Sequence, residues 1–182
     1  MAYDPKLLDT LLEGIALLRQ FKGDPIVVGI DGYGGAGKST LAALLSTRIP
    51  GCQVIPTDDF ASWEDPLGWW PRMMREVFSP LAEGRVPEYQ RYDWIDRVRR
   101  DWVRVEGSVL IIEGVSATRR EFRPYLDARV WIECPREVRL ARGLLRDGPE
   151  AIQNWLAWME AEDEYVLQHR PREGADYVLS TG

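Results

Sequence analysis

The stretch that decides the fold is "GIDGYGGAGKST", residues Gly29 to Thr40, which follows the apolar run "PIVV". Gly32, four further residues, and then Gly37, Lys38 and Ser39 have the Walker A spacing of a phosphate-binding loop. Such glycines let successive N–H groups point at an anion, and the next helix adds its positive end. Lys38 is expected to reach the β- and γ-phosphates of a nucleotide. The expected nucleotide contacts are Gly32, Gly34, Gly35, Ala36, Gly37, Lys38, Ser39 and Thr40.

The elements expected around this loop alternate between strands and helices. Short apolar runs predict buried strands at 26–30, 52–56, 108–115 and 128–134, and a last strand at 175–180. Helices are expected over 38–48, 135–145 and 150–169, and Asp4-Pro5 begins an amphipathic helix that ends before Gly23. The pattern predicts an α/β fold of the P-loop NTPase type. Its sheet would be mainly parallel and five-stranded, with helices on both faces and an N-terminal helix in front.

Composition and charge narrow the class of protein. The 182 residues fit a single domain, and 45% hydrophobic with 29% charged residues is typical of a soluble chain. A net charge of −6 argues against a broad nucleic-acid surface, which needs a basic face. Two distant cysteines and one histidine exclude a zinc ribbon and fit a reducing compartment. With no basic leader and no run of membrane-spanning length, we expect a cytoplasmic protein with no membrane partner.

The segment from about 60 to 105 is the part whose fold the sequence leaves open. "DPLGWWPRMMREVFSPLAEG" is typical of one or two helices broken by prolines. "RDWVRVE" alternates as a strand does but also fits the extension of a helix, and both alternatives stay open. Trp63, Trp69 and Trp70 either cover an acceptor as a lid or pack beneath the neighbouring acidic motif. We expect packing.

Two adjacent acids, Asp58 and Asp59, lie just after the strand expected at 52–56. A carboxylate there can take a proton from an attacking hydroxyl or hold Mg²⁺ through water. It would repel an acceptor that is itself a phosphate. The alternative is that one of the two merely caps the next helix. Because one residue can cap while the other faces the cleft, we expect a functional role.

Five motifs occur in a fixed order: "GIDGYGGAGKST", "TDDF", "RYDW", "VLIIEGV" and "VRLARGLLRD". In order and spacing they resemble the uridine kinase-like branch of the P-loop kinases. That branch includes uridine/cytidine kinases, nicotinamide riboside kinase, bacterial pantothenate kinase and phosphoribulokinase. The resemblance extends from about Ile26 to Leu179. It implies a phosphotransferase that uses ATP and Mg²⁺ on a small-molecule acceptor. Relatives often form dimers or tetramers, so a homo-oligomer stays an open alternative.

The resemblance also assigns residues. It implies that Asp58 is the catalytic base and that Asp59 is either a neighbour of Mg²⁺ or a structural cap. Glu113, which closes the "LIIEG" strand, would hold Mg²⁺ together with Ser39. A buried carboxylate after four apolar residues is costly unless it meets a cation, which agrees with that role. The alternative places Glu113 in water just past the strand.

The last motif contributes arginines. Arg139, Arg142 and Arg146 share one helix face by their spacing. The resemblance implies a lid at about 139–150 in which Arg142 and Arg146 steady charge on the transferring phosphoryl group. The second arginine of the family's pair is Gly143 here, a departure that would weaken or reshape the lid. For Arg139 we expect an ordinary solvated position.

The acceptor side resembles the family less closely. "RYDW" is similar to the "YDF" that lines the family's nucleoside pocket, which implies acceptor contacts from Tyr92, Asp93 and Trp94. Asp93 would bind a sugar hydroxyl and the rings would stack on a base. A histidine follows in members that phosphorylate nucleosides, and Arg97 stands in its place. Arg85, Arg91 and Arg97 either hold an anionic acceptor or are solvated surface charge.

The leading hypothesis is therefore a kinase for a hydroxyl of a small, nucleoside-like molecule, with an acceptor segment at about 60–105. One alternative is a kinase for a phosphorylated acceptor, such as a nucleotide or a sugar phosphate. Another is an ATP-binding switch that works through a partner surface, against which the acid of the second strand and the arginines weigh. The identity of the acceptor and the choice of adenine over guanine stay open.

Overall fold

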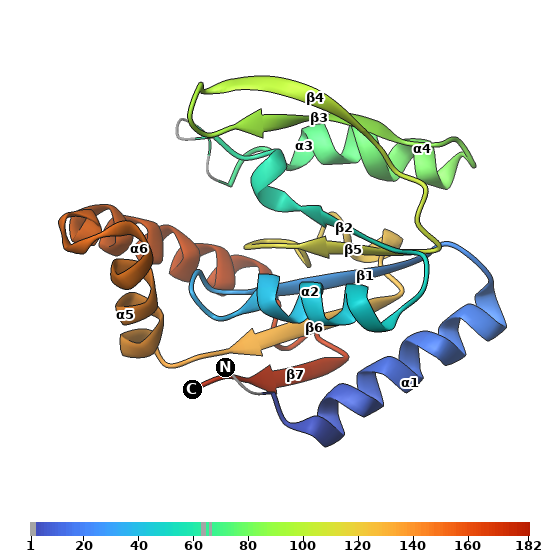
Figure 1. Cartoon of the computed structure of the whole chain (residues 1–182), viewed down its shortest axis with the longest axis horizontal. Coiled ribbons are helices and arrows are strands. Elements are labelled where there is room, and N and C mark those ends of the chain that lie inside the picture. Colours follow the sequence, from blue (N-terminus) through green and yellow to red (C-terminus); the bar gives the residue numbers. More distant parts are fainter. Residues whose placement is uncertain (1–2, 63–64, 66) are drawn as a thin grey trace.

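The computed structural model describes residues 3–62, 65 and 67–182. Its central sheet has five strands, all parallel to their neighbours. Their order is β2 (Cys52–Pro56), β5 (Val109–Glu113), β1 (Ile26–Gly32), β6 (Ala128–Glu133) and β7 (Tyr177–Ser180). The expected P-loop NTPase fold, with a parallel sheet and helices on both faces, is confirmed (Figure 1).

The two strands in the middle of the sheet, β5 and β1, are buried on both faces, which explains their largely apolar sequences. Every residue of β1 and β5 is buried. Ile26 and Val28 of β1 face one apolar cluster, which includes buried residues of α1 (Pro5–Lys22) and α2 (Lys38–Arg48). Val27 faces a second cluster on the opposite side of the sheet. The alternation thus packs helices against both faces.

The N-terminal helix α1 begins as expected. Asp4 is its N-cap and accepts a hydrogen bond from the backbone N–H of Lys6 at 2.9 Å, and Pro5 occupies the first turn. Its buried face consists of Leu8, Leu11 and Ile15. Leu7 lies at the edge of this apolar stripe and is 41% exposed.

The segment that the sequence left open forms a second layer beyond β2 (Figure 1). Three short helical pieces follow one another directly: α3 (Trp70–Met73), the π-helical η2 (Met74–Phe78) and α4 (Ser79–Ala82). An antiparallel hairpin follows, made of β3 (Glu88–Asp93) and β4 (Val98–Arg104). Residues 98–104 are therefore a strand, which resolves the choice left open by their alternation.

Aromatic packing joins this second layer to the sheet. Trp69 is buried, with its ring 6.0 Å from both Phe60 and Phe122. Tyr89 of β3 also meets Phe60, at 4.7 Å between ring centroids. The expected packing role is confirmed for Trp69. The half-buried ring of Trp70 lies under the Arg119 guanidinium at 4.7 Å, and Trp63 lies outside the described residues.

Two helices complete the edge where the parallel strands end (Figure 1). These are α5 (Arg136–Asp147) and α6 (Ile152–His169), joined by the 3-10 turn η4 (Pro149–Ala151). Further short 3-10 turns are η1 (Thr57–Asp59), directly after β2, and η3 (Arg123–Tyr125). Within the described part of the chain, the helices are too short or too polar to cross a membrane.

Candidate active site

A cleft of about 1090 Å³ lies at the carboxyl ends of the parallel strands. Its walls come from the phosphate-binding loop, η1, the end of β5, the hairpin, and α5 with α6. Ligands of open α/β sheets bind at this edge. The candidate nucleotide contacts that line it are Gly34, Gly35, Gly37, Lys38, Ser39 and Thr40.

Glycine is required in the loop for two physical reasons. Gly32 has φ 148°, and a Cβ there would lie 2.6 Å from the carbonyl oxygen of Ile132 on the neighbouring strand. Gly37 has φ 107° and is the N-cap of α2. The N–H groups of the first turn of α2 are available to bind an anion. Gly32 and Ala36 are absent from the lining of the cleft: Gly32 is buried against β6, and Ala36 is fully buried beneath the loop.

Lys38, Ser39 and Glu113 meet at the floor of the cleft. The Lys38 ammonium donates to the carbonyl oxygen of Tyr33 at 2.9 Å, and the Ser39 hydroxyl donates to Glu113 Oε1 at 3.0 Å. The register of β1 and β5 brings this about, because Glu113 pairs with Ile30 at the strand ends that lead into the loop. Glu113 is 7% exposed, so the expectation of a buried carboxylate is confirmed.

The electrostatics of Glu113 favour a cation. Burial raises the pKa of its carboxyl group, while the Lys38 charge and the Ser39 hydrogen bond act in the opposite direction. A carboxylate and a hydroxyl are oxygen ligands of the kind that Mg²⁺ takes beside nucleotide phosphates. Among residues 3–62, 65 and 67–182, no three acidic, histidine or cysteine side chains gather into a metal cage. Mg²⁺ beside phosphates needs only one or two protein ligands, so the pair fits this ion.

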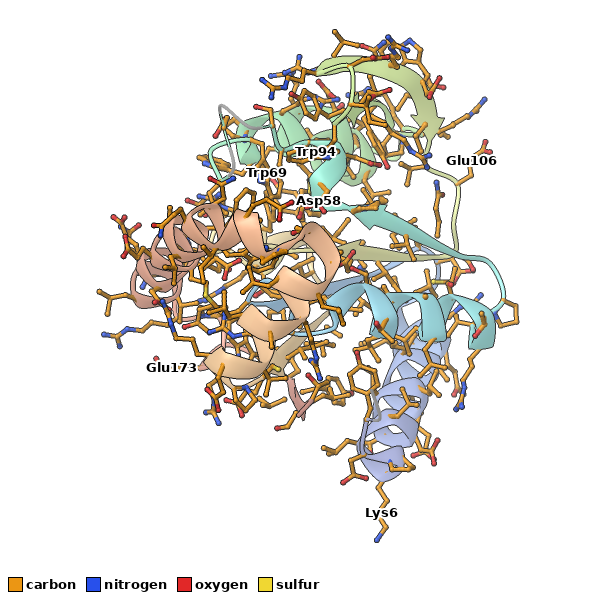
Figure 2. All side chains as sticks on the ribbon, turned by 60° about the vertical axis from the view of Figure 1, so that its left-hand side comes forward. Lys6, Asp58, Trp69, Trp94, Glu106 and Glu173 are labelled. Atoms are coloured by element: carbon orange, nitrogen blue, oxygen red, sulfur yellow. The ribbon has the colours of Figure 1, made fainter. Side chains whose placement is uncertain are left out.

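Asp58 and Asp59 have different surroundings. Asp58 lines the cleft, and its carbonyl oxygen accepts the Trp94 indole N–H at 3.2 Å. Asp59 accepts the Tyr89 hydroxyl at 2.8 Å and lies 3.4 Å from the Arg91 guanidinium. Burial raises the pKa of the Asp59 carboxyl. Asp59 is therefore engaged by the hairpin, an arrangement that favours the structural alternative for it. Figure 2 shows Asp58 just below Trp94 and Trp69.

Arg142 and Arg146 of α5 both line the cleft. Arg142 donates to the carbonyl oxygen of Gly35 at 3.2 Å and to the Thr181 hydroxyl at 3.3 Å, so it is attached to the phosphate-binding loop. Arg146 is largely exposed and pairs with Asp147 at 2.7 Å. One arginine is thus fixed against the loop, while the other stands at the cleft mouth.

The departure at Gly143 has a packing explanation. A Cβ at this position would lie 2.3 Å from the indole ring of Trp155 on α6. The Trp155 indole N–H donates to Asp147 at 2.9 Å, and the Arg146 guanidinium lies 5.6 Å from its ring. The indole therefore occupies the space that the family's second arginine would need.

The expectation that Arg139 is solvated is wrong. Arg139 is 3% exposed, with its guanidinium 4.0 Å from the Tyr33 ring. It lies 3.6 Å from Glu162 of α6, which is fully buried. Glu162 accepts the Gly34 backbone N–H at 2.9 Å, and burial raises the pKa of its carboxyl. Because α6 packs against α5, this face of α5 is turned toward the loop.

The four residues expected on the acceptor side are divided among three places. Trp94 lines the cleft. Asp93 accepts the backbone N–H groups of Ile95 and Asp96, each at 2.9 Å, so its carboxylate holds the turn of the hairpin. Tyr92 and Arg97 line a separate hollow of about 750 Å³ between the hairpin and α3.

Asp31 is a residue that the sequence reasoning missed. It is fully buried near the end of β1 and accepts hydrogen bonds from the segment that follows β5. The donors are the Ser116 N–H at 3.0 Å, the Thr118 N–H at 2.9 Å and the Thr118 hydroxyl at 2.8 Å. The Tyr165 hydroxyl of α6, at 2.5 Å, and the Gly32 N–H, at 2.7 Å, bring the total to five. The available signal was a lone acid in an apolar strand, directly before the loop.

Known proteins share this architecture. The AAA domain family matches residues 28–168. A uridine kinase of Streptococcus agalactiae serotype V is 24% identical over 87% of this chain and 88% of its own length. A uridine kinase of Borrelia turicatae is 26% identical over 86% of each chain. The structure of a possible uridine kinase from Bacillus stearothermophilus superposes with a TM-score of 0.70 at 23% identity, over 95% of this chain and 97% of that one.

The family match covers most of the chain and includes the loop, the acidic turn and α5 with α6. The curated relatives match over nearly their full length, and the structural likeness bears on the fold alone. The chain therefore belongs to the AAA domain family, in the uridine kinase-like branch of the P-loop kinases.

Proposed function

We propose that this protein is a kinase that transfers the γ-phosphate of ATP, in the presence of Mg²⁺, to a hydroxyl of a small molecule. One observation carries the proposal: a single cleft holds Lys38, the Ser39–Glu113 pair and the Asp58 carboxylate. Phosphoryl transfer needs phosphate binding, a cation site and a group that takes the acceptor's proton, and these side chains fit the three needs. The resemblance to uridine kinases favours a nucleoside-like acceptor.

The loop backbone and Lys38 are proposed to bind the ATP phosphates. The Lys38 ammonium donates to the carbonyl oxygen of Tyr33, and on ATP binding it would exchange this contact for phosphate oxygens. Ser39 and Glu113 are proposed to hold Mg²⁺, which would neutralise charge on the phosphates when bound. Asp59 is assigned a structural role, because Tyr89 and Arg91 already engage it.

Asp58 is proposed as the general base. As the acceptor oxygen bonds to the γ-phosphorus, the bond between that phosphorus and the β,γ-bridging oxygen breaks. ADP leaves with the electron pair of that bond, and the acceptor's proton passes to the Asp58 carboxylate. Arg142 and Arg146 line the same cleft and would stabilise the charge on the transferring group.

The same proposal assigns a role to each segment of the chain. Residues 1–182 would work as one kinase domain, with the acceptor segment at about 60–105 and the ATP lid at about 139–150. The lid would keep Arg142 on the loop and bring Arg146 to the phosphates. Gly143 would supply the room for Trp155 that this geometry needs.

The test is ADP formation from ATP and Mg²⁺, measured with and without a panel of acceptors. The panel would contain nucleosides, nicotinamide riboside, pantothenate, sugars and sugar phosphates. Stimulation by a hydroxyl compound that is lost in Asp58→Asn and in Lys38→Ala is the expected result. Tight ATP binding with no stimulation by any acceptor would contradict the kinase and favour an ATP-binding switch.

A further inference from the structure

A second hollow, called here the basic pocket, lies between the start of α3 and the turn of the β3–β4 hairpin. Its volume is about 750 Å³. Four arginines line it, Arg72, Arg75, Arg97 and Arg99, together with Asp65 as the one acidic residue among the lining side chains described. Because the chain as a whole has a net charge of −6, the clustering of positive charge at this pocket requires an explanation.

The neighbouring carboxylates do not balance these charges. Arg72 and Arg75 share Glu76, each with a nitrogen 2.9 Å from one of its two oxygens. Burial, assisted by the Arg99 and Arg75 charges, lowers the pKa of the Arg72 guanidinium. In the described part of the chain, the Arg97 and Arg99 guanidinium groups have no hydrogen-bond or ion-pair partner. Among the described residues, the pocket therefore presents two unpaired guanidinium groups.

The Tyr92 hydroxyl adds an unused donor to the same pocket. It is buried and has no hydrogen-bond partner among the described residues. Buried hydroxyls are nearly always paired, because leaving one unpaired costs free energy. Tyr92 stands directly opposite Arg99 in the hairpin register, so both side chains leave the same face of the hairpin. A donor hydroxyl beside a free guanidinium matches the oxygens of a phosphate or a carboxylate.

Arg97 occupies a costly place for its residue type. Its φ is 55°, in the left-handed region that glycine or asparagine usually fills at a hairpin turn. A non-glycine residue persists there when the structure or the function requires its side chain. The turn thus has a strained backbone conformation at Arg97 and places the guanidinium group of that residue in the pocket.

The basic pocket adjoins the cleft through two aromatic rings. Tyr92 lines the pocket, Trp94 lines the cleft, and their ring centroids are 5.2 Å apart at 88°. The Trp94 indole N–H reaches the Asp58 carbonyl oxygen at 3.2 Å. A molecule that lies across this pair of rings would have one end in the pocket and the other beside Asp58.

We propose that the basic pocket binds an oxyanion, phosphate or carboxylate, carried by the acceptor whose hydroxyl is phosphorylated beside Asp58. This inference rests on the proposed kinase function and adds the chemical class of the acceptor, an anionic hydroxyl compound. Holding the anion behind the Tyr92–Trp94 rings keeps it away from the Asp58 carboxylate, which would repel it. The transferred group then reaches the neutral, hydroxyl end.

The experiment compares matched pairs that differ in the anion: ribose with ribose 5-phosphate, and glycerol with glycerate. Binding is measured calorimetrically on protein saturated with Mg²⁺ and a non-hydrolysable ATP analogue, which keeps the phosphate-binding loop occupied. At least one charged compound should bind about tenfold more tightly than its neutral partner. The pair that shows the preference tells phosphate from carboxylate.

Variants locate the site. Arg99→Gln and Tyr92→Phe should each weaken binding of the charged compound, by about tenfold for the arginine. Arg97→Gly should weaken it too, with an unchanged or higher Tm, because glycine accepts the positive φ without strain. Arg85→Gln is the matched control, since Arg85 pairs with Glu83 on the surface and lies outside the pocket. It should leave binding unchanged.

The outcomes separate this inference from the kinase reaction. Charged compounds that bind no better than neutral ones, that do not bind, or that bind equally well to Arg99→Gln and Arg97→Gly would overturn the anion site. ADP formation with a neutral acceptor alone would overturn it and leave the kinase standing. Binding that depends on Arg99, with no ADP formation from authentic ATP, would contradict the kinase and support the anion site.

Discussion

The phosphate side and the hairpin side of this molecule are built in different ways. On the phosphate side, Lys38 and Glu113 are both 7% exposed, and their positions follow from strands that are buried throughout. On the hairpin side, the residues of β4 are mostly exposed, and its arginines project from a two-stranded sheet. The residues proposed to bind phosphate and Mg²⁺ are thus positioned by the buried core. The residues proposed to select the acceptor lie on an exposed surface, where substitutions are tolerated more easily.

The largest loss of activity is expected when a side chain proposed to act on the phosphates or on the acceptor proton is removed. Lys38→Ala should lower acceptor-stimulated ADP formation by about 100- to 1,000-fold, because one preorganised donor to the phosphates is lost. Asp58→Asn should lower it by about 100- to 10,000-fold while ATP binding is kept. Steady-state rates and ATP affinity would be measured for both variants. Asp58→Asn with full activity would remove the general base from the proposal.

A second test uses the buried carboxylate of Glu113. Glu113→Gln should lower activity by about 100-fold, equivalent to about 2.7 kcal/mol, because a ligand proposed for Mg²⁺ is lost. The variant should also melt at a higher temperature than the wild type at neutral pH. Burial raises the Glu113 pKa above 4.5, so the folded state binds more protons than the unfolded state, and stability falls as the pH rises from 4.5 through the raised pKa.

The measurement is Tm against pH from 4 to 8 for both proteins. The stabilisation by Glu113→Gln should be small below pH 4.5 and grow above it. Glu160→Gln, a change at an exposed position on α6, is the control and should show no such trend. A variant that is less stable than the wild type at every pH would mean that the carboxylate is a structural ion-pair partner.

A third test concerns the junction of α5 and α6. Gly143→Ala should destabilise the protein by about 1–3 kcal/mol, because its Cβ would lie 2.3 Å from the Trp155 ring. Chemical denaturation would measure this loss. In Gly143→Ala with Trp155→Leu, the cost of the alanine should largely disappear, since the smaller side chain leaves room. If the two changes were additive, the explanation of Gly143 by the indole would fail.

The smallest effect is expected at Asp59. Asp59→Asn should cost about 1 kcal/mol of stability, since its bond to Tyr89 and its attraction to Arg91 are weakened. Activity should change by less than about threefold, because the side chain serves the hairpin in our assignment. ADP formation and denaturant unfolding would be compared with Asp58→Asn. A loss of activity as large as that of Asp58→Asn would return Asp59 to the cation site.

Much of the phosphate side could be predicted because its signals are local. The loop is recognised by glycine spacing, and a buried strand by its continuous apolar run. The parallel order of β5 and β1 then brings Glu113 to Ser39. Arg139 could not be predicted, because its burial depends on Glu162 and Tyr33, which are distant in sequence. The role of Asp31 was missed for the same reason, since its partners come from the segment after β5 and from α6.

The sequence by itself determined the class of fold, the phosphate-binding loop and the likeness to uridine kinases, because periodicity and short motifs record local conformation. Only the tertiary structure decided that 98–104 is a strand and that the Asp59 carboxylate bonds to Tyr89 of the hairpin. It alone showed that Trp155 fills the space over Gly143 and that four arginines share one pocket. These features arise from contacts between segments that are distant in sequence, and a local sequence pattern carries no information about such contacts.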